Sequence, residues 1–586
     1  MNPRSRVART RLPYGILVCA FVVAYGSQRW LDAQTRTEGV STLGQLFGGF
    51  FSKSSYVGAT PVSLARFDDH RSRIKLHGFS IAPPADATWF LAYSPYSSAT
   101  IVQTVWFVKD PHLYSVWASG KKIGAQPSSL IVRLEFYGAL TEDFTTRVMQ
   151  MKTAEWGAES KHVLAFDVRP LKLGLLDCAE YEGRVVDPGA PPGFGQHPFV
   201  VSLAGRVCPH PDADGFVVDI SRSRRTPEGE PEPDHDPEGE AFVQSLHLDP
   251  FDGPTVESIL VMDRPERGRR ANRFWVEDAV LTPDAVWVTR REPGLPRAEK
   301  RLTRIDAVSN QITDERPANG ILAGASGTSV WLFRPGAGTD RTMAWRVDEG
   351  AADPVEMPVS CAPGRPAPSS AFHAGDYGVW LGCQDAGEDA RQAASWRVQR
   401  RLDPRTGASI AELAIAPGPI HGDARLAWAE EFNPPSASPS CRVNEIDAAA
   451  NRIVRTVSLG SFACEYLTIT GNEAWFVRSN ETFTHVDLTN RRTLHTVKLP
   501  KGRTAGGIAI GRDVVWVLTT PAPDAEEASA RLGSDGGLMR VSRSAGTVVG
   551  PMIPTGTANR LIGLAGNAVW LHDVEGAIVK VRDRAR

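Results

Sequence analysis

Acid–base or metal chemistry needs histidines and carboxylates that converge on one point, and this chain offers few of them. Residues 257–586 contain five histidines, which are His373, His421, His485, His495 and His572. His485 and His495 fall inside regular strand patterns, so we expect them to be packing or surface residues. The other three fall in or near loops, where a general base would have to stand.

Two short acidic segments could hold a cation. One contains Asp234, His235 and Asp236, and the other contains His210, Asp212 and Asp214. Neither matches the spacing of an EF-hand or of a zinc-binding HExxH helix, and acidic loops are usually solvated faces. We therefore predict no metal, no cofactor and no catalytic residue.

Cations are more frequent than acids in the segments that join the repeats described below. The ligand-binding candidates are these cations together with one histidine: Arg267, Arg270, Arg273, Arg365, His421, Lys501, Arg503 and Arg560. Gathered on one face, they would form a positive patch that suits an anionic glycan, peptide carboxylates or lipid head groups. The alternative is that arginine is simply the common surface cation of this chain.

Tryptophan recurs in the second half of the chain, each time inside a short apolar strand. The seven positions are Trp287, Trp331, Trp380, Trp428, Trp475, Trp516 and Trp570. Their spacing is close to the roughly 40 to 50 residues of a four-stranded propeller blade. Alternating apolar and polar residues between Asn, Gly, Asp and Pro turns support half-buried strands. The pattern predicts a mainly β chain with a seven-bladed β-propeller.

The last repeat stops after its third strand. The segment ESILVMDRP, at 257–265, precedes the first complete repeat and could supply the missing strand. Pairing the two ends would close the ring and remove its exposed edges. We therefore expect the propeller to span 257–586.

The N-terminus carries four arginines followed by the apolar run GILVCAFVVAYG. A basic flank before a run of this length is typical of a secretory signal. We expect residues 1–31 to be a signal peptide or membrane anchor and 32–60 a linker. The chain would then be periplasmic or otherwise extracytoplasmic, with its N-terminal segment able to contact the inner membrane. The formal net charge of −2 argues against a nucleic-acid partner.

Six cysteines lie beyond the apolar run, and an exported chain can pair them in fifteen ways. Their positions suggest three structural disulfides, because each falls near one other in the chain. The pairs are Cys178 with Cys208, Cys361 with Cys383, and Cys441 with Cys464.

Residues 61–250 mix strand patterns with two helical segments, which predicts a smaller α+β domain. IKLHGFSIAPP reads as one strand. One helix should begin near Thr141, with that threonine as its N-cap, and the second should span Glu238–Leu248.

Two resemblances follow from these residues. HGFSIAPPADATWFLA, GRVCPHPDADGFVVDIS and EGEAFVQSLHL resemble a secreted domain of Gram-negative bacteria to which no function is attached, similar in outline to the PsbP and DcrB type of sheet. RTLHTVKLP and LTRIDAVSN resemble the YVTN, NHL and streptogramin-lyase class of WD40-like propellers. That second class contains lyases, ligand binders and protein-interaction platforms. A lyase would need a histidine–glutamate pair on one loop face, for which His421 with Glu430 or Glu431 is the best match.

Together these features favour an exported envelope protein whose propeller is a binding or interaction platform for a protein or an anionic glycan. The alternative is a lyase- or hydrolase-type enzyme that acts at the channel mouth, and the sequence leaves open whether there is any activity.

Overall fold

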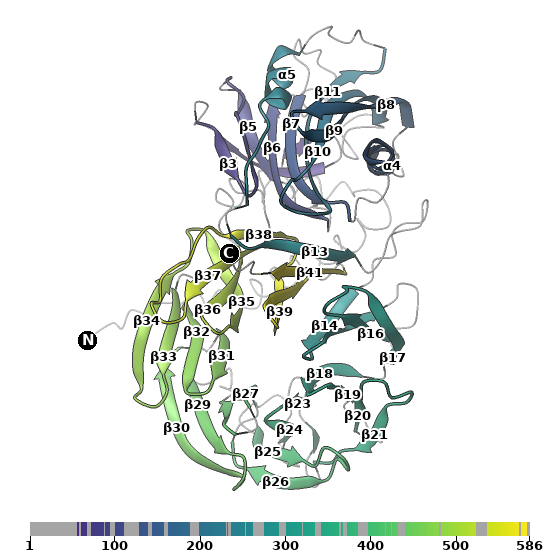
Figure 1. Ribbon diagram of the computed structural model, residues 1–586. Helices are drawn as coiled ribbons and strands as arrows, with labels where there is room; N and C mark the ends of the chain where they lie inside the picture. Colours follow the sequence, from purple (N-terminus) through teal and green to yellow (C-terminus); the bar gives the residue numbers. More distant parts are fainter. Residues whose placement is uncertain are drawn as a thin grey trace, which may run out of the picture.

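The computed structural model consists of a ring of small sheets beside a domain built on one large sheet (Figure 1). The structure describes residues 55–57, 60–66, 72–86, 88–93, 100–109, 128–138, 143–156, 162–187, 199–229, 231, 236–251, 253–261, 275–291, 300–318, 320–334, 342–361, 365–366, 372–384, 396–415, 418–423, 425–431, 440–462, 465–479, 482–522, 536–573 and 576–582. The signal segment and linker expected at 1–60 lie almost wholly outside these ranges. Within them, neither helix has the length and apolar run that a membrane crossing requires.

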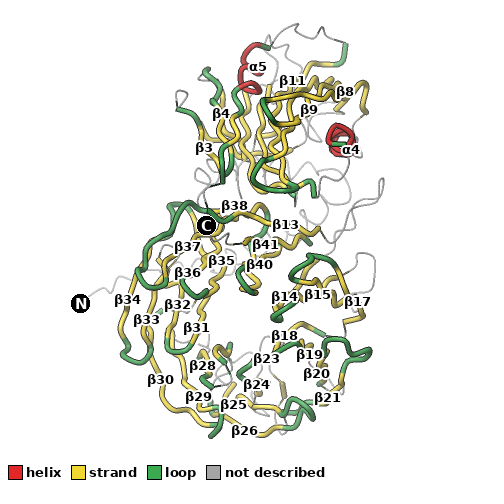
Figure 2. The backbone as a smooth tube through the Cα atoms, viewed as in Figure 1, coloured by secondary structure: helices red, strands yellow, loops and turns green. Residues whose placement is uncertain are grey.

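The N-terminal domain contains a nine-stranded antiparallel sheet. Its order is β1 (Ser55–Val57), β2 (Thr60–Arg66), β5 (Trp89–Tyr93), β6 (Ile101–Lys109), β7 (Ser128–Phe136), β11 (Phe216–Pro227), β10 (Phe199–Pro209), β9 (Leu176–Asp187) and β8 (His162–Leu173). Two helices pack on it, α4 (Phe144–Trp156) and α5 (Pro237–Gln244), and Figure 2 places both in this domain. The fold class is therefore the predicted one, a propeller preceded by an α+β domain.

Three local expectations in this domain were wrong in detail. The segment expected to be one strand is a hairpin of β3 (Ile74–Leu76) and β4 (Phe79–Ile81), because Gly78 turns the chain with a φ of +81°. Helix α5 ends at Gln244, and His247–Leu248 forms β12, which pairs with β4. The oxygen that caps α4 belongs to Asp143, which accepts from the backbone N–H of Thr146 at 2.8 Å, while Thr141 lies outside the described residues.

A buried ionic cluster joins α4 to the sheet. The Lys152 side chain, only 2% exposed, donates to Glu155 Oε2 at 2.8 Å and to Asp219 Oδ2 at 2.5 Å. Tyr181 donates to the second Asp219 oxygen at 2.8 Å, and Arg133 donates to Glu155. The positive charges are thus matched by carboxylates, as buried charges require.

Glu135 lies at the border of this cluster and is 8% exposed. Thr100 Oγ1 donates to it at 3.0 Å. Burial, reinforced by the negative charge of Glu155, raises the pKa of Glu135 to about 7. This carboxyl group is therefore only half-ionised near neutral pH.

Seven blades form the ring, each with four antiparallel strands, and a parallel bridge between Gly324 and Ala374 joins the innermost strands of blades 2 and 3 into one sheet. Blades 1 to 3 are β14 (Trp275–Leu281), β15 (Ala285–Arg291), β16 (Lys300–Asp306) and β17 (Ile312–Ala318); β18 (Ile321–Ser326), β19 (Ser329–Arg334), β20 (Met343–Val347) and β21 (Val355–Pro358); and β23 (Phe372–Gly375), β24 (Gly378–Gln384), β25 (Trp396–Leu402) and β26 (Ser409–Leu413). Blades 4 to 6 are β27 (Ile420–Gly422), β28 (Ala427–Glu430), β29 (Cys441–Asp447) and β30 (Arg452–Gly460); β31 (Glu465–Thr470), β32 (Glu473–Ser479), β33 (Thr482–Asp487) and β34 (Arg492–Lys498); and β35 (Arg503–Ile510), β36 (Val514–Pro521), β37 (Gly536–Ser542) and β38 (Ile553–Gly556). In each, the first strand lies innermost and the fourth outermost (Figure 1). A short strand, β22 (Arg365–Pro366), pairs with β24 of blade 3.

The seventh blade closes the ring with strands from both ends of this region. β39 (Arg560–Ala565), β40 (Ala568–His572) and β41 (Ala577–Arg582) come from the C-terminus, and the outermost strand is β13 (Thr255–Val261). β13 pairs with β41 in antiparallel register from Thr255↔Arg582 to Val261↔Ala577. This confirms that the last blade takes its fourth strand from the segment before the first repeat.

All seven blade tryptophans are buried in the second strands, with exposures of 0 to 3%. In six blades the residue opposite on the third strand is arginine, lysine or histidine. In blade 4 that residue is Glu445, and Arg455 from the fourth strand lies over the Trp428 ring instead, 5.4 Å from its centroid. The tryptophans are therefore core residues. Four of them gain cation–π attraction, from Arg304, Arg401, Arg455 and Lys580.

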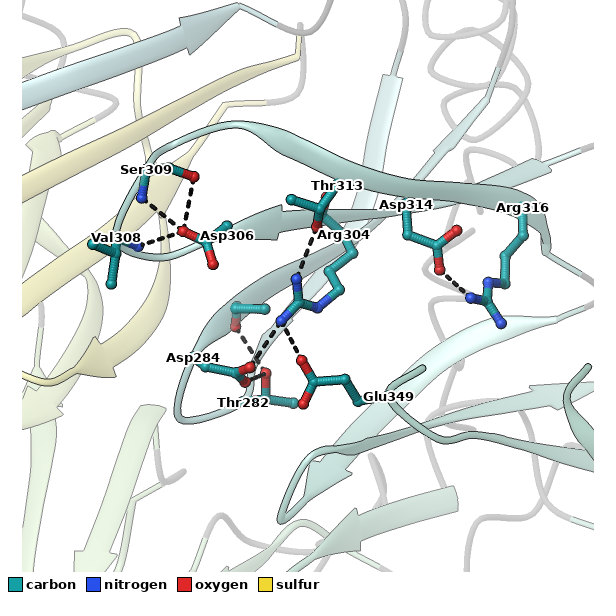
Figure 3. Close-up of polar contacts among 11 residues, drawn as sticks. Thr282, Asp284, Arg304, Asp306, Val308, Ser309, Thr313, Asp314, Arg316 and Glu349 are labelled. Atoms are coloured by element: carbon teal, nitrogen blue, oxygen red, sulfur yellow. Dashed lines mark hydrogen bonds and ion pairs between the residues drawn. The ribbon is translucent and has the colours of Figure 1, made fainter. Parts of the chain in front are cut away.

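Several of these cations also bind the turn between the third and fourth strands of the next blade. Figure 3 shows the contact between blades 1 and 2, where Arg304 donates to Asp284 at 2.8 Å and to Glu349 of blade 2 at 2.6 Å. In the last blade, Lys580 donates to the Ala307 carbonyl at 2.7 Å and to Asn310 Oδ1 at 3.2 Å, both in blade 1. We call this set of contacts the inter-blade clamp.

Two disulfides are described, Cys178–Cys208 between β9 and β10, and Cys361–Cys383 in blade 3. Cys441 is also disulfide-bonded, while Cys464, its expected partner, lies outside the described residues. The first two predicted pairs are confirmed.

A cluster of two histidines and a phenylalanine lies at the junction between the two domains. The Phe251 ring lies 4.0 Å from the His210 ring and 4.6 Å from the His77 ring, measured between centroids. His77 Nε2 is 3.3 Å from Thr255 Oγ1 at the start of β13. Burial lowers the pKa of His77 to about 4, with a smaller contribution from the charge of His210. His77 is therefore neutral at pH 7.

Candidate functional site at the mouth of the propeller channel

The first strands of the seven blades surround the centre of the ring (Figure 1), and all begin at the same mouth of the channel because each blade repeats the same antiparallel order. Five of these strands carry a β-bulge within their first four residues. Bulges redirect side chains and are common next to binding sites. We call this rim of first-strand beginnings the channel mouth.

Blades 3 and 4 bring two histidines and a carboxylate together at the channel mouth. His421, in β27, has its Nε2 3.8 Å from Glu430 Oε2 in β28, a separation longer than a hydrogen bond. His373 occupies the matching second position of β23. It lies close enough to His421 for the charge of His421 to affect the pKa of His373. The structure therefore places His421 beside Glu430, while Glu431 is 3.5 Å from the Arg442 guanidinium.

Burial lowers the pKa of His373 to about 4, and the charge of His421 adds to this effect. His373 is thus a neutral imidazole at pH 7. The Nε2 atoms of His373 and His421 are both shielded from solvent, and neither has a hydrogen-bond partner among the described residues. A polar nitrogen buried without a hydrogen bond costs free energy, which a polar group of an incoming molecule would relieve once the side chain turns towards it.

Tyr466 projects from the neighbouring blade 5. It is 49% exposed and has a φ of +51°, in the left-handed region that bulky residues avoid. It lies at the bulge of β31, where the register shifts between Glu465 and Thr468. β31 packs beside β27, which carries His421. An exposed aromatic ring on a strained backbone is the type of feature that concentrates at binding sites.

The predicted cations do not form one exposed set. Arg503 is 4% exposed, and its guanidinium donates to Thr519 Oγ1 and to the Thr519 carbonyl, both at 2.9 Å. Lys501 is exposed in the turn before β35. Arg560 is exposed and donates to the Glu277 carbonyl of blade 1 at 3.5 Å.

The remaining candidates are not described at side-chain level. Arg267, Arg270 and Arg273 lie outside the described residues, as do Asp234 and His235, and of Arg365 only the backbone in β22 is described. Among described carboxylates at the channel mouth, Glu277 pairs with Arg291 and Lys300. The described part of this mouth therefore carries both signs of charge.

The segment with His210, which was considered for a cation and not predicted to bind one, makes structural contacts. His210 Nε2 lies 2.8 Å from the Gly78 carbonyl and 3.1 Å from the Asp249 carbonyl. No group of three metal-ligating side chains occurs within the described ranges.

Sequence reasoning identified His421 and Glu430 but missed Tyr466, and it placed His373 near a loop without assigning it a role. Tyr466 sits in SFACEYLTIT without a glycine or asparagine to mark a left-handed residue, so no local signal was available.

Comparisons with known proteins add a fold-level similarity. No family model matches the chain, and no curated protein matches it. Among solved structures, it is similar to the crystal structure of BamB from Moraxella catarrhalis, with 12% identity, 57% of this chain and 98% of that chain covered, and a TM-score of 0.31. A similarity of this size says nothing about a ligand or partner.

Proposed function

We propose that this chain is an extracytoplasmic binding protein whose propeller captures a partner protein or an anionic glycan at the channel mouth, over blades 3 to 5. The observation that carries this proposal is Tyr466, an exposed aromatic side chain held in a left-handed conformation. Such a residue costs about 1 to 3 kcal/mol of strain, which glycine or asparagine would relieve. Its ring would supply contact area of the kind that dominates binding energies.

His373 and His421 would add the polar part of the recognition. Their shielded Nε2 atoms have no partner among the described residues, so a carboxylate, hydroxyl or amide group of the partner would gain a hydrogen bond in a partly desolvated site. The mixed charge of the surrounding rim favours a protein surface over a uniformly anionic polymer.

The compartment is inferred from two features. The basic and apolar N-terminal segment is typical of an export signal, and disulfides persist in oxidising compartments. The N-terminal segment would hold the chain at the inner membrane if it is retained as an anchor.

The test is capture from a bacterial envelope extract by the tagged full-length chain, after chemical cross-linking. We expect Tyr466→Asn combined with His421→Ala to lose the captured species, whether protein or glycan, while remaining at least as thermally stable as wild type. The matched control is Val308→Ser, which truncates an 82% exposed side chain in the outer turn of blade 1 between β16 and β17. Equal capture by all three proteins would refute the assignment of this mouth.

The His421–Glu430 pair supports the alternative, a lyase or hydrolase that acts at the same mouth. A histidine and a carboxylate 3.8 Å apart can shorten to a hydrogen bond when substrate binds and then serve as base and orienter. If captured material is chemically changed by wild type but released intact by Glu430→Gln, as judged by mass spectrometry, the enzyme is the correct alternative.

A further inference from the structure

A groove crosses the large sheet of the N-terminal domain. All of its lining residues belong to that domain and none to the channel mouth. It has a volume of about 440 Å³ and runs over β8, β9, β10 and β11 to the start of α5. This size suits a small molecule. Its lining is dominated by arginine, acidic and hydroxyl side chains together with strand backbone, so its ligand should be polar.

The strand register explains why the sheet is hollow here. Ser202 on β10 lies opposite Arg184 of β9 and Arg224 of β11 in one cross-strand row. Two residues further along β10, Ala204 lies between Glu182 and Arg222 in the next row. Because long side chains flank short ones in both rows, a depression forms along β10. The rows are about 7 Å apart, roughly the length of a monosaccharide ring.

The row that contains Ala204 is already charge-balanced. Arg222 pairs with Asp236 at 3.3 Å and with Glu240 at 3.4 Å, at the N-terminal end of α5. On the other side, Arg169 lies 3.4 Å from Asp167 and 3.3 Å from Glu182. This end of the groove offers carboxylate oxygens that can accept hydrogen bonds from ligand hydroxyls.

The row that contains Ser202 is not charge-balanced in the same way. Arg224 is partly buried and makes no ion pair with any described residue, and its Nε is shielded from solvent without an acceptor there. A guanidinium in this state is poorly solvated and favours an anion that can accept from it. Arg184 adds a second guanidinium on the far side of Ser202, two strands or about 10 Å away along the sheet.

We propose that this groove binds a small acidic saccharide, with its carboxylate or phosphate on Arg224 and its hydroxyls on the Asp167 and Glu182 end. The anionic group would accept two parallel hydrogen bonds from the guanidinium, as arginine's fork geometry allows. This site is separate from the one assigned under the proposed function and does not depend on it.

The test uses three sugars that differ mainly in the group at carbon 6: glucuronate, glucose 6-phosphate and glucose. Binding to the full-length chain is measured by isothermal titration calorimetry and by the shift in thermal unfolding midpoint. We expect glucuronate or glucose 6-phosphate, or both, to bind and to stabilise the chain, and glucose to bind at least tenfold more weakly. The acid that binds more tightly identifies the anionic group as carboxylate or phosphate.

Arg224→Met should weaken the acid at least tenfold and leave the affinity for glucose unchanged. Arg206→Met is the matched control, since Arg206 lies on β10 outside the lining and pairs with Glu180, which is also outside it, and it should bind as wild type. Ser202→Leu, which fills the depression, should abolish binding of both acids without removing a charge.

The proposal is overturned if neither acid binds at 10 mM, if glucose binds as tightly as the acids, or if Arg224→Met and Arg206→Met behave alike. Circular dichroism at the same temperature establishes that each variant is folded, and Arg224→Gln replaces Arg224→Met if that variant is not. Tyr466→Asn should leave sugar binding unchanged, so failure of this site and failure of the channel-mouth site give different results.

Discussion

The junction between the domains should make the chain sensitive to mild acid through His77. Burial against Phe251 and Thr255 lowers the pKa of this histidine from 6.5 to about 4. The unfolded chain therefore binds a proton at His77 below about pH 6.5, whereas the folded chain does so only near pH 4. The contribution of His77 to the free energy of unfolding is therefore fully present above pH 6.5, and it is lost as the pH drops towards 4.

The size of the effect follows from the two pKa values. At pH 5.0 the difference in proton binding favours unfolding by about 2 kcal/mol, and at pH 7.5 by less than about 0.1 kcal/mol. His77→Gln keeps a polar side chain next to Thr255 but cannot titrate. We expect wild type to lose about 2 kcal/mol more of its free energy of unfolding than His77→Gln when the pH is lowered from 7.5 to 5.0.

The assay is urea unfolding followed by tryptophan fluorescence at the two pH values, with analysis of the transition that reports the N-terminal domain. His162→Gln is the control, because His162 is an exposed histidine at the start of β8, away from the junction. If His77→Gln and wild type lose the same free energy, the junction histidine is not the source and the reasoning fails.

Two further predictions follow from charged groups in the fold. Glu135 has a folded pKa of about 7, above the 4.5 of an ordinary glutamate, so its contribution to stability is present below pH 4.5 and is lost as the pH rises towards 7. Glu135→Gln should therefore be more stable than wild type by about 3 kcal/mol at pH 7.5 and nearly equal in stability at pH 4.5, as measured by urea unfolding. Arg304→Met removes the charged hydrogen bonds to Asp284 and Glu349 but keeps an apolar contact with Trp287. We expect the free energy of unfolding to fall by about 2 kcal/mol, a value already reduced because both carboxylates are partly exposed. The loss should be smaller in 1 M salt. An Arg304→Met protein as stable as wild type at low salt would show that the inter-blade clamp does not contribute to blade packing.

The ring could be predicted from the sequence because each blade repeats the same local pattern. A buried tryptophan such as Trp287 in every second strand, and tight turns between strands, recur without long-range information. The strand that closes the ring could also be predicted, because the last repeat lacks a fourth strand and the other end of the repeat region can supply it.

The parts that could not be predicted depend on contacts between distant residues. His247 pairs with Ser80, which lies far away in the sequence, so the local pattern alone predicts that the helix continues through the residues that form β12. Arg503 looked like a loop cation, but the register of β35 turns its side chain inward to Thr519. The left-handed Tyr466 arises from a bulge against β32, and the Arg224 groove arises from the cross-strand register, neither of which has a signature in neighbouring residues.

The pairing of β13 with β41 also constrains the order in which the ring can form. The two strands are more than 300 residues apart in the chain, yet they seal one sheet. A chain made from its N-terminus exposes β13 as an unpaired edge until β41 emerges, and closing so long a loop is slow. Each of the other blades can assemble from contiguous residues, so the pairing of β13 with β41 is the last step in forming the ring. Loss of the final strand would leave two open edges at once, on β13 and on β40, and would convert a closed ring into an aggregation-prone arc.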